Sequence, residues 1–207
     1  MKQLLNIDTW DRKDHFNFFN QFDSPYFGVT IDVDCTKAYL KAKEQNIPFS
    51  IYYLHKSITA ANNIEPFRYR IIDGKVYIYD TINASPTVNR PNNTFGFSYI
   101  KYHEDLKEFT EIAKKETKRV RNTKGLDPST SGDNVIQYSS LPWLKFTSLS
   151  HAQNSLFPDS CPKISFGKMT LVGTKRTMPM SVHVHHALMD GYEVGLYVED
   201  FQKLMNQ

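Results

Sequence analysis

The chain has 207 residues, of which 40% are hydrophobic and 23% are charged, and this composition excludes general disorder and permits a sizeable core. A net charge of +3 is too small an excess to indicate nucleic-acid binding. No apolar run is long enough for a signal peptide or a transmembrane helix, so we expect a cytoplasmic protein.

Aromatic residues are abundant, with 14 Phe, 12 Tyr and 2 Trp. This abundance favours a β-rich core with aromatic packing, and an aromatic-lined pocket for a flat or apolar ligand is the alternative. Cys35 and Cys161 are far apart in the sequence and form no CxxC pair. The cysteines therefore do not indicate a zinc ribbon or a thioredoxin-type motif.

In the first half of the chain, helical and strand patterns are interspersed. We expect helices over residues 9–22, 35–46 and 51–64, and strands over 26–34, 68–72 and 75–80. Thr9 is the expected N-cap of the first helix. Asp73-Gly74 separates the last two strands and predicts a hairpin, because this dipeptide is the strongest short turn signal.

The second half is richer in strands. We expect strands over 94–102, 163–173 and 178–187, a strand that starts at 135 and is interrupted at Pro142, a loop over 126–134, and helices over 103–122 and 192–207. The segment TKRT joins the strands 163–173 and 178–187. The basic end of the 103–122 helix favours a solvated helix face over a nucleic-acid contact. Together the elements predict an α+β fold with a mixed, largely antiparallel sheet flanked by helices.

Three of the seven histidines fall within HVHHALMDG, residues 183–191. If the strand persists, His183 and His185 share one face and His186 lies on the other. A zinc site would need a further ligand, and no HExxH or Cys/His pattern supports one. A set of hydrogen-bonded core histidines at a strand end is a second interpretation.

The third interpretation is a general base, because a neutral imidazole can take a proton at pH 7. His186 precedes Asp190 by four residues, at the exit from the strand into a turn that Gly191 permits. Asp190 can orient the imidazole, or it can hold the turn by pairing with a cation elsewhere. The spacing leaves both roles open.

The segment HHALMDG (185–191) resembles the HHxxxDG active-site motif of the chloramphenicol acetyltransferase family. Three more segments resemble that family in the same order: WDRKDHFNFF (10–19), SSLPW (139–143) and PKISFGKM (162–169). The resemblance runs from about Trp10 to the C-terminus, and the chain is identified as a member of the family.

The resemblance implies an acetyl-CoA-dependent O-acetyltransferase that forms no covalent acyl-enzyme and needs neither a bound cofactor nor a metal. His186 is the implied general base, and the hydroxyl of Ser139 is the implied donor to the oxyanion. Asp190 is implied to be structural, paired with Arg12, as suits a rigid Arg–carboxylate contact.

The resemblance also implies residues that bind the two substrates. Ser165 falls where the family has a threonine that helps to hold a water, and Trp143 and Lys168 lie in segments that line the CoA channel. Candidates for the acceptor pocket are Phe19, Tyr26, Phe95 and Phe97. The resemblance makes chloramphenicol the leading candidate acceptor. Phe19 stands where members that acetylate chloramphenicol carry a tyrosine, so one hydrogen bond to the drug is lost while the ring is kept.

At the level of the molecule, the resemblance implies a single domain over 1–207, a two-layer α+β sandwich, a homotrimer with active sites at the subunit boundaries, and a role in antibiotic resistance. One alternative is a non-catalytic small-molecule-binding or assembly protein of the same fold. A lipoyl-type acyltransferase domain, which would need a thiol acceptor, is a further alternative. Consumption of acetyl-CoA with an acceptor separates the first alternative from an enzyme.

Overall fold

The computed structural model describes residues 1–126, 130, 132–154 and 159–207. Within this part of the chain, the larger sheet has seven strands. In spatial order they are β2 (Tyr26–Asp34), β10 (Lys175–His185), β8 (Lys163–Phe166), β7 (Val135–Ser140), β5 (Asn83–Asn89) and β6 (Phe95–Phe97), with β9 (Thr170–Val172) paired to the start of β10.

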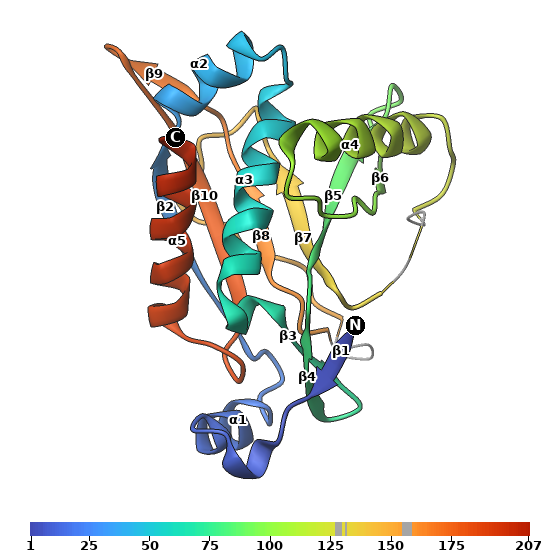
Figure 1. Cartoon of the computed structure of the whole chain (residues 1–207), viewed down its shortest axis with the longest axis vertical. Helices are drawn as coiled ribbons and strands as arrows, with labels where there is room; N and C mark the ends of the chain where they lie inside the picture. The colour runs from blue at the N-terminus through green and yellow to red at the C-terminus, as the bar shows by residue number, and fades with distance from the viewer. Residues whose placement is uncertain (127–129, 131, 155–158) are drawn as a thin grey trace.

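The centre of this sheet is parallel and its outer pairs are antiparallel. Strands β5, β7 and β8 run parallel, whereas β2, β8 and β9 are antiparallel to β10 and β6 is antiparallel to β5. Four helices lie against one face of the sheet (Figure 1): α2 (Thr36–Glu44), α3 (Phe49–Asn63), α4 (Leu106–Arg121) and α5 (Gly191–Met205). The predicted mixed α+β class is confirmed.

A smaller sheet lies beside the N-terminus. Its strand order is β1 (Lys2–Leu4), β4 (Lys75–Tyr79) and β3 (Tyr69–Ile72), and η2 (Glu65–Arg68) leads into β3. Asp73 and Gly74 both have positive φ, 50° and 71°, as the predicted tight hairpin turn requires. Fully buried Arg70 donates to four backbone carbonyls, among them those of Asp133 and Val135, and so ties this hairpin to the start of β7.

The two faces of the large sheet differ in chemistry. Along β10, the helix-facing residues Met178, Met180, Val182 and Val184 are at most 2% exposed and form part of the core. The alternate residues Ser181 and His183 point to the opposite, outer face, because side chains alternate along a strand. The outer face is therefore the polar one.

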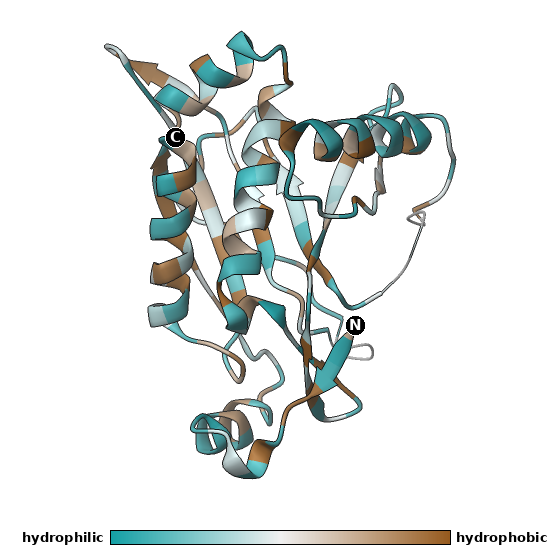
Figure 2. Ribbon diagram, in the orientation of Figure 1, coloured by the Kyte–Doolittle hydropathy of each residue, from teal (hydrophilic) through white to brown (hydrophobic). Residues whose placement is uncertain are grey.

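Aspartate side chains cap the N-termini of α4 and α5, the two helices described after β6. Asp105 accepts hydrogen bonds from the backbone of Lys107 and Glu108 and starts α4, and Asp190 caps α5 in a capping box with Glu193. Figure 2 shows α4 as mostly hydrophilic, and its last turn carries three cations. The basic end is thus a solvated helix terminus. No helix of the described residues is long and apolar enough to cross a bilayer.

The first predicted helix is shorter than expected, and the predicted cap at Thr9 is wrong. Thr9 belongs to η1 (Ile7–Thr9), where its hydroxyl donates to the carbonyl of Asn6. Helix α1 (Lys13–Phe19) begins after Arg12, which is its N-cap residue and makes no side-chain capping bond. The tryptophan of the segment therefore precedes the helix.

Three predicted strand boundaries also differ. The strand expected over 94–102 forms a regular ladder only at β6, followed by a single bridge at Ile100. Between them, both the backbone N–H and the hydroxyl of Ser98 donate to the carbonyl of Pro86, and the backbone N–H of Tyr99 donates to Glu116. The strand expected over 163–173 breaks at residues 167–169 into β8 and β9. Most of TKRT belongs to β10, since the turn lies at Gly173, whose φ is 61°.

Strands β1 and β5 were not predicted, and the expected loop 126–134 lies partly outside the described residues.

Candidate active site

His186 lies in the turn directly after β10 and not on the strand itself. Its backbone N–H donates to the carbonyl of Pro25 at 2.7 Å. Its ring stacks on Phe19, with centroids 3.8 Å apart and planes at 15°, and contacts Phe27 at 4.6 Å. Two aromatic rings and one backbone bond therefore fix the position of the imidazole.

The side chain of His186 is half-buried. Nδ1 is buried and has no hydrogen-bond partner among the described residues. Because His186 is only half-buried while its Nδ1 is buried, we infer that Nε2 is the nitrogen that a reactant reaches. A neutral imidazole with its proton on Nδ1 would present Nε2 as the acceptor, as a general base requires.

Arg12 holds the turn that carries His186. Its guanidinium donates to the carbonyl of His186 at 2.8 Å, to the carbonyl of Ala187 at 3.3 Å, and to the carboxylate of Asp190 at 2.9 Å. The backbone N–H of Tyr192 and the Arg12 guanidinium together lower the pKa of Asp190 to about 2. Of the two roles that the spacing left open for Asp190, the structure shows the pairing with a cation, Arg12. The carboxylate of Asp190 does not contact the imidazole of His186.

His183 and His185 have environments of their own. His183 Nδ1 lies 3.1 Å from the hydroxyl of Ser181 on the outer face of the sheet. His185 is 5% exposed, and burial lowers its pKa to about 4. Among the described residues, no three His, Cys, Asp or Glu side chains converge as metal ligands would.

Ser139 belongs to a row of hydroxyl side chains that crosses the outer face of the sheet. Ser139 on β7 pairs in register with Ser165 on β8, Ser165 pairs with Ser181 on β10, and Ser181 pairs with Thr30 on β2. Residues directly opposite one another in neighbouring strands share a face. The predicted oxyanion donor and the predicted water-holding serine are therefore neighbours.

The row of hydroxyls is remote from His186 within one chain. Ser139 lies two strands away from Ser181, about 10 Å across the sheet, and His186 lies five residues beyond Ser181, about 17 Å along β10. The Cα atoms of Ser139 and His186 are thus roughly 19 Å apart by this estimate. Their side chains cannot meet at one carbonyl group of the same chain.

Trp143 and Lys168 lie beside the hydroxyl row, in two segments that hydrogen-bond each other. The backbone N–H of Lys168 donates to the carbonyl of Leu144 at 2.7 Å, and that of Leu141 donates to Phe166 at 2.8 Å. Trp143 is 68% exposed and Lys168 is exposed as well. Both side chains are open to solvent beside Ser139 and Ser165.

The four predicted acceptor residues fall into three places. Phe19 stacks on His186. Tyr26 contacts His185, and its hydroxyl bonds Asp159. Phe95 and Phe97 lie on β6, at the edge of the sheet opposite to β2, with 43% and 39% of their surface exposed. One chain therefore does not bring these four side chains into one pocket.

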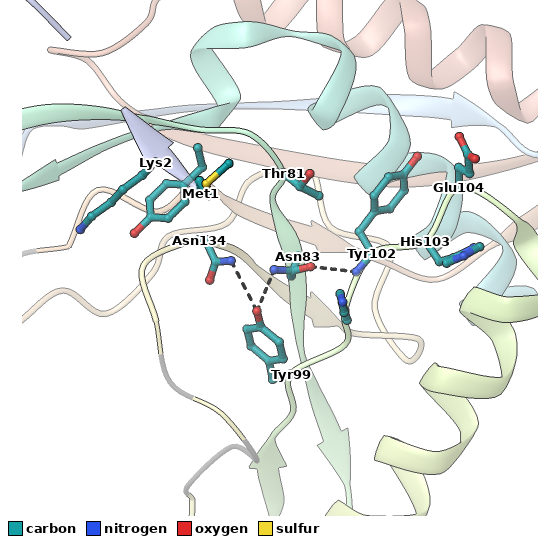
Figure 3. A pocket seen from close by; sticks show the side chains of 11 residues that line it. Met1, Lys2, Thr81, Asn83, Tyr99, Tyr102, His103, Glu104 and Asn134 are labelled. Atoms are coloured by element: carbon teal, nitrogen blue, oxygen red, sulfur yellow. Dashed lines mark hydrogen bonds between the residues drawn. The ribbon is translucent and has the colours of Figure 1, made fainter. Parts of the chain in front are cut away.

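The surface of the described part of the chain includes two cavities with different surroundings. One has a volume of about 740 Å³ and is lined by Tyr26, Lys163 and His185, among others, so it opens beside the histidine turn. The other has a volume of about 710 Å³ and lies near the N-terminus. There Asn83 and Asn134 point toward Tyr99, whose hydroxyl oxygen accepts from their amide groups (Figure 3). None of the predicted site residues lines this second cavity.

Four residues near the predicted site were not singled out from the sequence. Pro25 and Phe27 hold His186, Gly28 lies against His183, and His151 lies beside Ser165. The strand alternation of 26–34 gives the spacing of Phe27 and Gly28 but not their contacts. No local sequence pattern marks His151, because a loop side chain is placed by the segment it crosses.

The fold and the HHxxxDG turn define an acyltransferase, and comparisons with known proteins bear this out. A protein-family model described as chloramphenicol acetyltransferase matches residues 2–202 of this chain. Chloramphenicol acetyltransferases of Proteus mirabilis and Staphylococcus aureus are 25% and 29% identical to this chain; the alignments cover 99% and 98% of this chain and 94% and 98% of the relatives. The chain belongs to the chloramphenicol acetyltransferase family.

Solved structures agree with this assignment. A structure named chloramphenicol acetyltransferase is 30% identical, covers 99% of this chain and 100% of its own, and superposes with a TM-score of 0.91. A probable dihydrolipoamide acetyltransferase from Listeria monocytogenes, at 13% identity and a TM-score of 0.70, covers 93% of this chain and 88% of its own. The second likeness is one of fold alone.

Proposed function

We propose that this acyltransferase transfers the acetyl group of acetyl-CoA to a hydroxyl group of a small acceptor, with chloramphenicol as the first candidate. The observation that carries the proposal is the fixed, half-buried imidazole of His186, whose Nδ1 is buried and whose Nε2 is therefore the inferred base. The curated relatives named chloramphenicol acetyltransferase support the choice of acceptor.

In the proposed reaction, Nε2 of His186 takes the proton from the acceptor hydroxyl while the oxygen attacks the thioester carbonyl. The tetrahedral intermediate carries its negative charge on the former carbonyl oxygen, where the hydroxyl of Ser139 donates a hydrogen bond. The intermediate collapses with cleavage of the carbon–sulfur bond. His186 returns its proton to the CoA sulfur, and an ester and free CoA are released.

The other predicted residues have supporting roles in this proposal. Arg12 and Asp190 keep the histidine turn in place, and Ser165 holds a water near the reaction centre. The exposed indole of Trp143 suits the pantetheine arm of CoA, and the exposed cation of Lys168 suits its phosphates. Phe19, Tyr26, Phe95 and Phe97 contribute to the acceptor side.

We further infer a homotrimer whose active sites lie at the subunit boundaries. Because Ser139 and His186 are roughly 19 Å apart in one chain, a complete site needs His186 from one copy and Ser139 from the next. Residues 1–207 would form one domain of the family, since the match spans 2–202. A cytoplasmic location fits a CoA thioester as the donor.

The first test is release of free CoA from acetyl-CoA and chloramphenicol, followed with a thiol reagent. We expect His186→Ala to lower kcat by at least about a thousandfold, and Ser139→Ala by about a hundred- to a thousandfold. His103→Ala removes an imidazole at the cavity near the N-terminus and should keep the wild-type rate. If both His186→Ala and Ser139→Ala keep wild-type rates, the proposed mechanism is wrong.

A further inference from the structure

His151 lies beside the row of hydroxyl side chains on the outer face of the sheet. Its Nε2 is 3.5 Å from the hydroxyl oxygen of Ser165, the register partner of Ser139. Its ring meets that of His183 edge-on, with centroids 4.9 Å apart and planes at 88°. An imidazole is thus placed next to Ser165, one strand away from Ser139.

His183, the first histidine of the HVHH segment, holds the loop that carries His151. Its Nδ1 lies 3.1 Å from the hydroxyl of Ser181, and it also forms a hydrogen bond with the backbone of Leu149. Gly28 faces the His183 ring across the β2–β10 pair, and a Cβ at this position would collide with that ring. His183 therefore acts as a positioning residue for residues 149–151.

The surroundings of His151 are polar. Lys163 pairs in register with His183 on the same face, is 6% exposed, and donates to the carboxylate of Asp159 at 2.9 Å. Burial, with smaller effects of His183 and Lys163, lowers the pKa of His151 to about 4. The ring is therefore neutral at pH 7 and offers one nitrogen as a donor and one as an acceptor.

We propose that His151 forms a hydrogen bond with the acceptor, and that the site therefore selects hydroxylated molecules that carry a second hydrogen-bonding group beside the reacting hydroxyl. An acceptor with only an apolar group at that point would leave Nδ1, the ring nitrogen that does not contact Ser165, desolvated and unpaired. This inference rests on the proposed acetyl transfer and specifies the substrate class of that same site.

A matched pair of alcohols tests the inference: 1-phenyl-1,2-ethanediol and 2-phenylethanol, which differ by one hydroxyl. We measure kcat/KM for both by CoA release and compare the diol-to-monoalcohol ratio among variants. The wild type should prefer the diol by at least about tenfold. His151→Leu should bring the ratio close to one, mainly through a higher KM for the diol, and His151→Gln should keep most of the preference.

Two controls make the result decisive. Melting curves and size-exclusion profiles check that the His151 variants are folded like the wild type, and the His186→Ala variant gives the background rate for each alcohol. A ratio that does not change in His151→Leu, or a wild type without a preference for the diol, overturns the inference while leaving acetyl transfer standing. If no CoA release with chloramphenicol or either alcohol depends on His186, the proposed function itself is wrong, and the inference with it.

Discussion

Arg12 connects three groups that are adjacent only in the folded chain: the carbonyls of His186 and Ala187 and the carboxylate of Asp190. The side chain of Arg12 is 14% exposed and that of Asp190 is 40% exposed. The pair is therefore only moderately stabilising. Its larger effect is geometric, since the same guanidinium positions the turn that carries the proposed base.

Asp190→Asn separates these two effects. Asn keeps a side-chain oxygen for the cap of α5 but loses the charge that pairs with Arg12. We expect a loss of about 1 kcal/mol of stability, a melting temperature lower by about 2–4 °C, and a kcat lower by at least about tenfold. Asp8→Asn, in the exposed pair with Lys13, is the matched control and should change neither quantity. An unchanged kcat in Asp190→Asn would contradict the positioning role.

His185 makes stability depend on pH in a window that Asp190 does not affect. Burial lowers the pKa of His185 from 6.5 to about 4, so protonation favours the unfolded chain. The contribution of neutral His185 to the unfolding free energy is complete above pH 6.5 and is lost as the pH falls toward 4. At pH 5 the unfolding free energy is lower by about 2 kcal/mol. Asp190, with a pKa of about 2, loses its contribution only below pH 3.8.

Urea denaturation at pH 7.5 and pH 5.0 measures this effect. The wild type should lose more unfolding free energy between the two pH values than His185→Gln does, by about 2 kcal/mol. His15→Gln, an exposed histidine on α1, serves as the control and should retain the wild-type pH dependence. Equal losses in the wild type and His185→Gln would refute the buried, neutral state of His185.

At the level of elements, the β2–β10 pair positions His183, because Gly28 on β2 leaves room for the His183 ring. In Gly28→Ala the new methyl group must displace the ring of His183, so we expect a destabilisation of about 1–3 kcal/mol. Gly195→Ala in α5, where a Cβ meets nothing within 4 Å, should instead stabilise the protein by about 0.5–1 kcal/mol. Thermal unfolding of both variants checks the opposite signs.

Elements with strong local signals were predictable, and elements set by distant contacts were not. The hairpin at Asp73-Gly74 and the strand of β2 follow from turn chemistry and alternation. Strand β5 was missed because it contains Pro86, which weakens any strand signal. At the site, motif resemblance identified His186, Arg12 and Asp190, whereas His151 depends on how a loop crosses the sheet.

At the level of the molecule, the separation of Ser139 from His186 predicts that two inactive variants can complement each other. In a ring of mixed chains, His186→Ala supplies Ser139 and Ser139→Ala supplies His186, so co-expressed variants should regain about a quarter of the wild-type activity. Each variant purified alone is the control. No gain on co-expression would contradict sites shared between neighbouring copies.

The same separation has a consequence for inheritance. Suppose a cell carries one intact gene and one gene whose product lacks both Ser139 and His186. Each active site then needs two intact neighbours, so random assembly leaves about a quarter of the sites working, where self-contained chains would leave half. A damaged copy is then partly dominant, and the cell's tolerance of a second, defective gene depends on how the two products are kept from mixing.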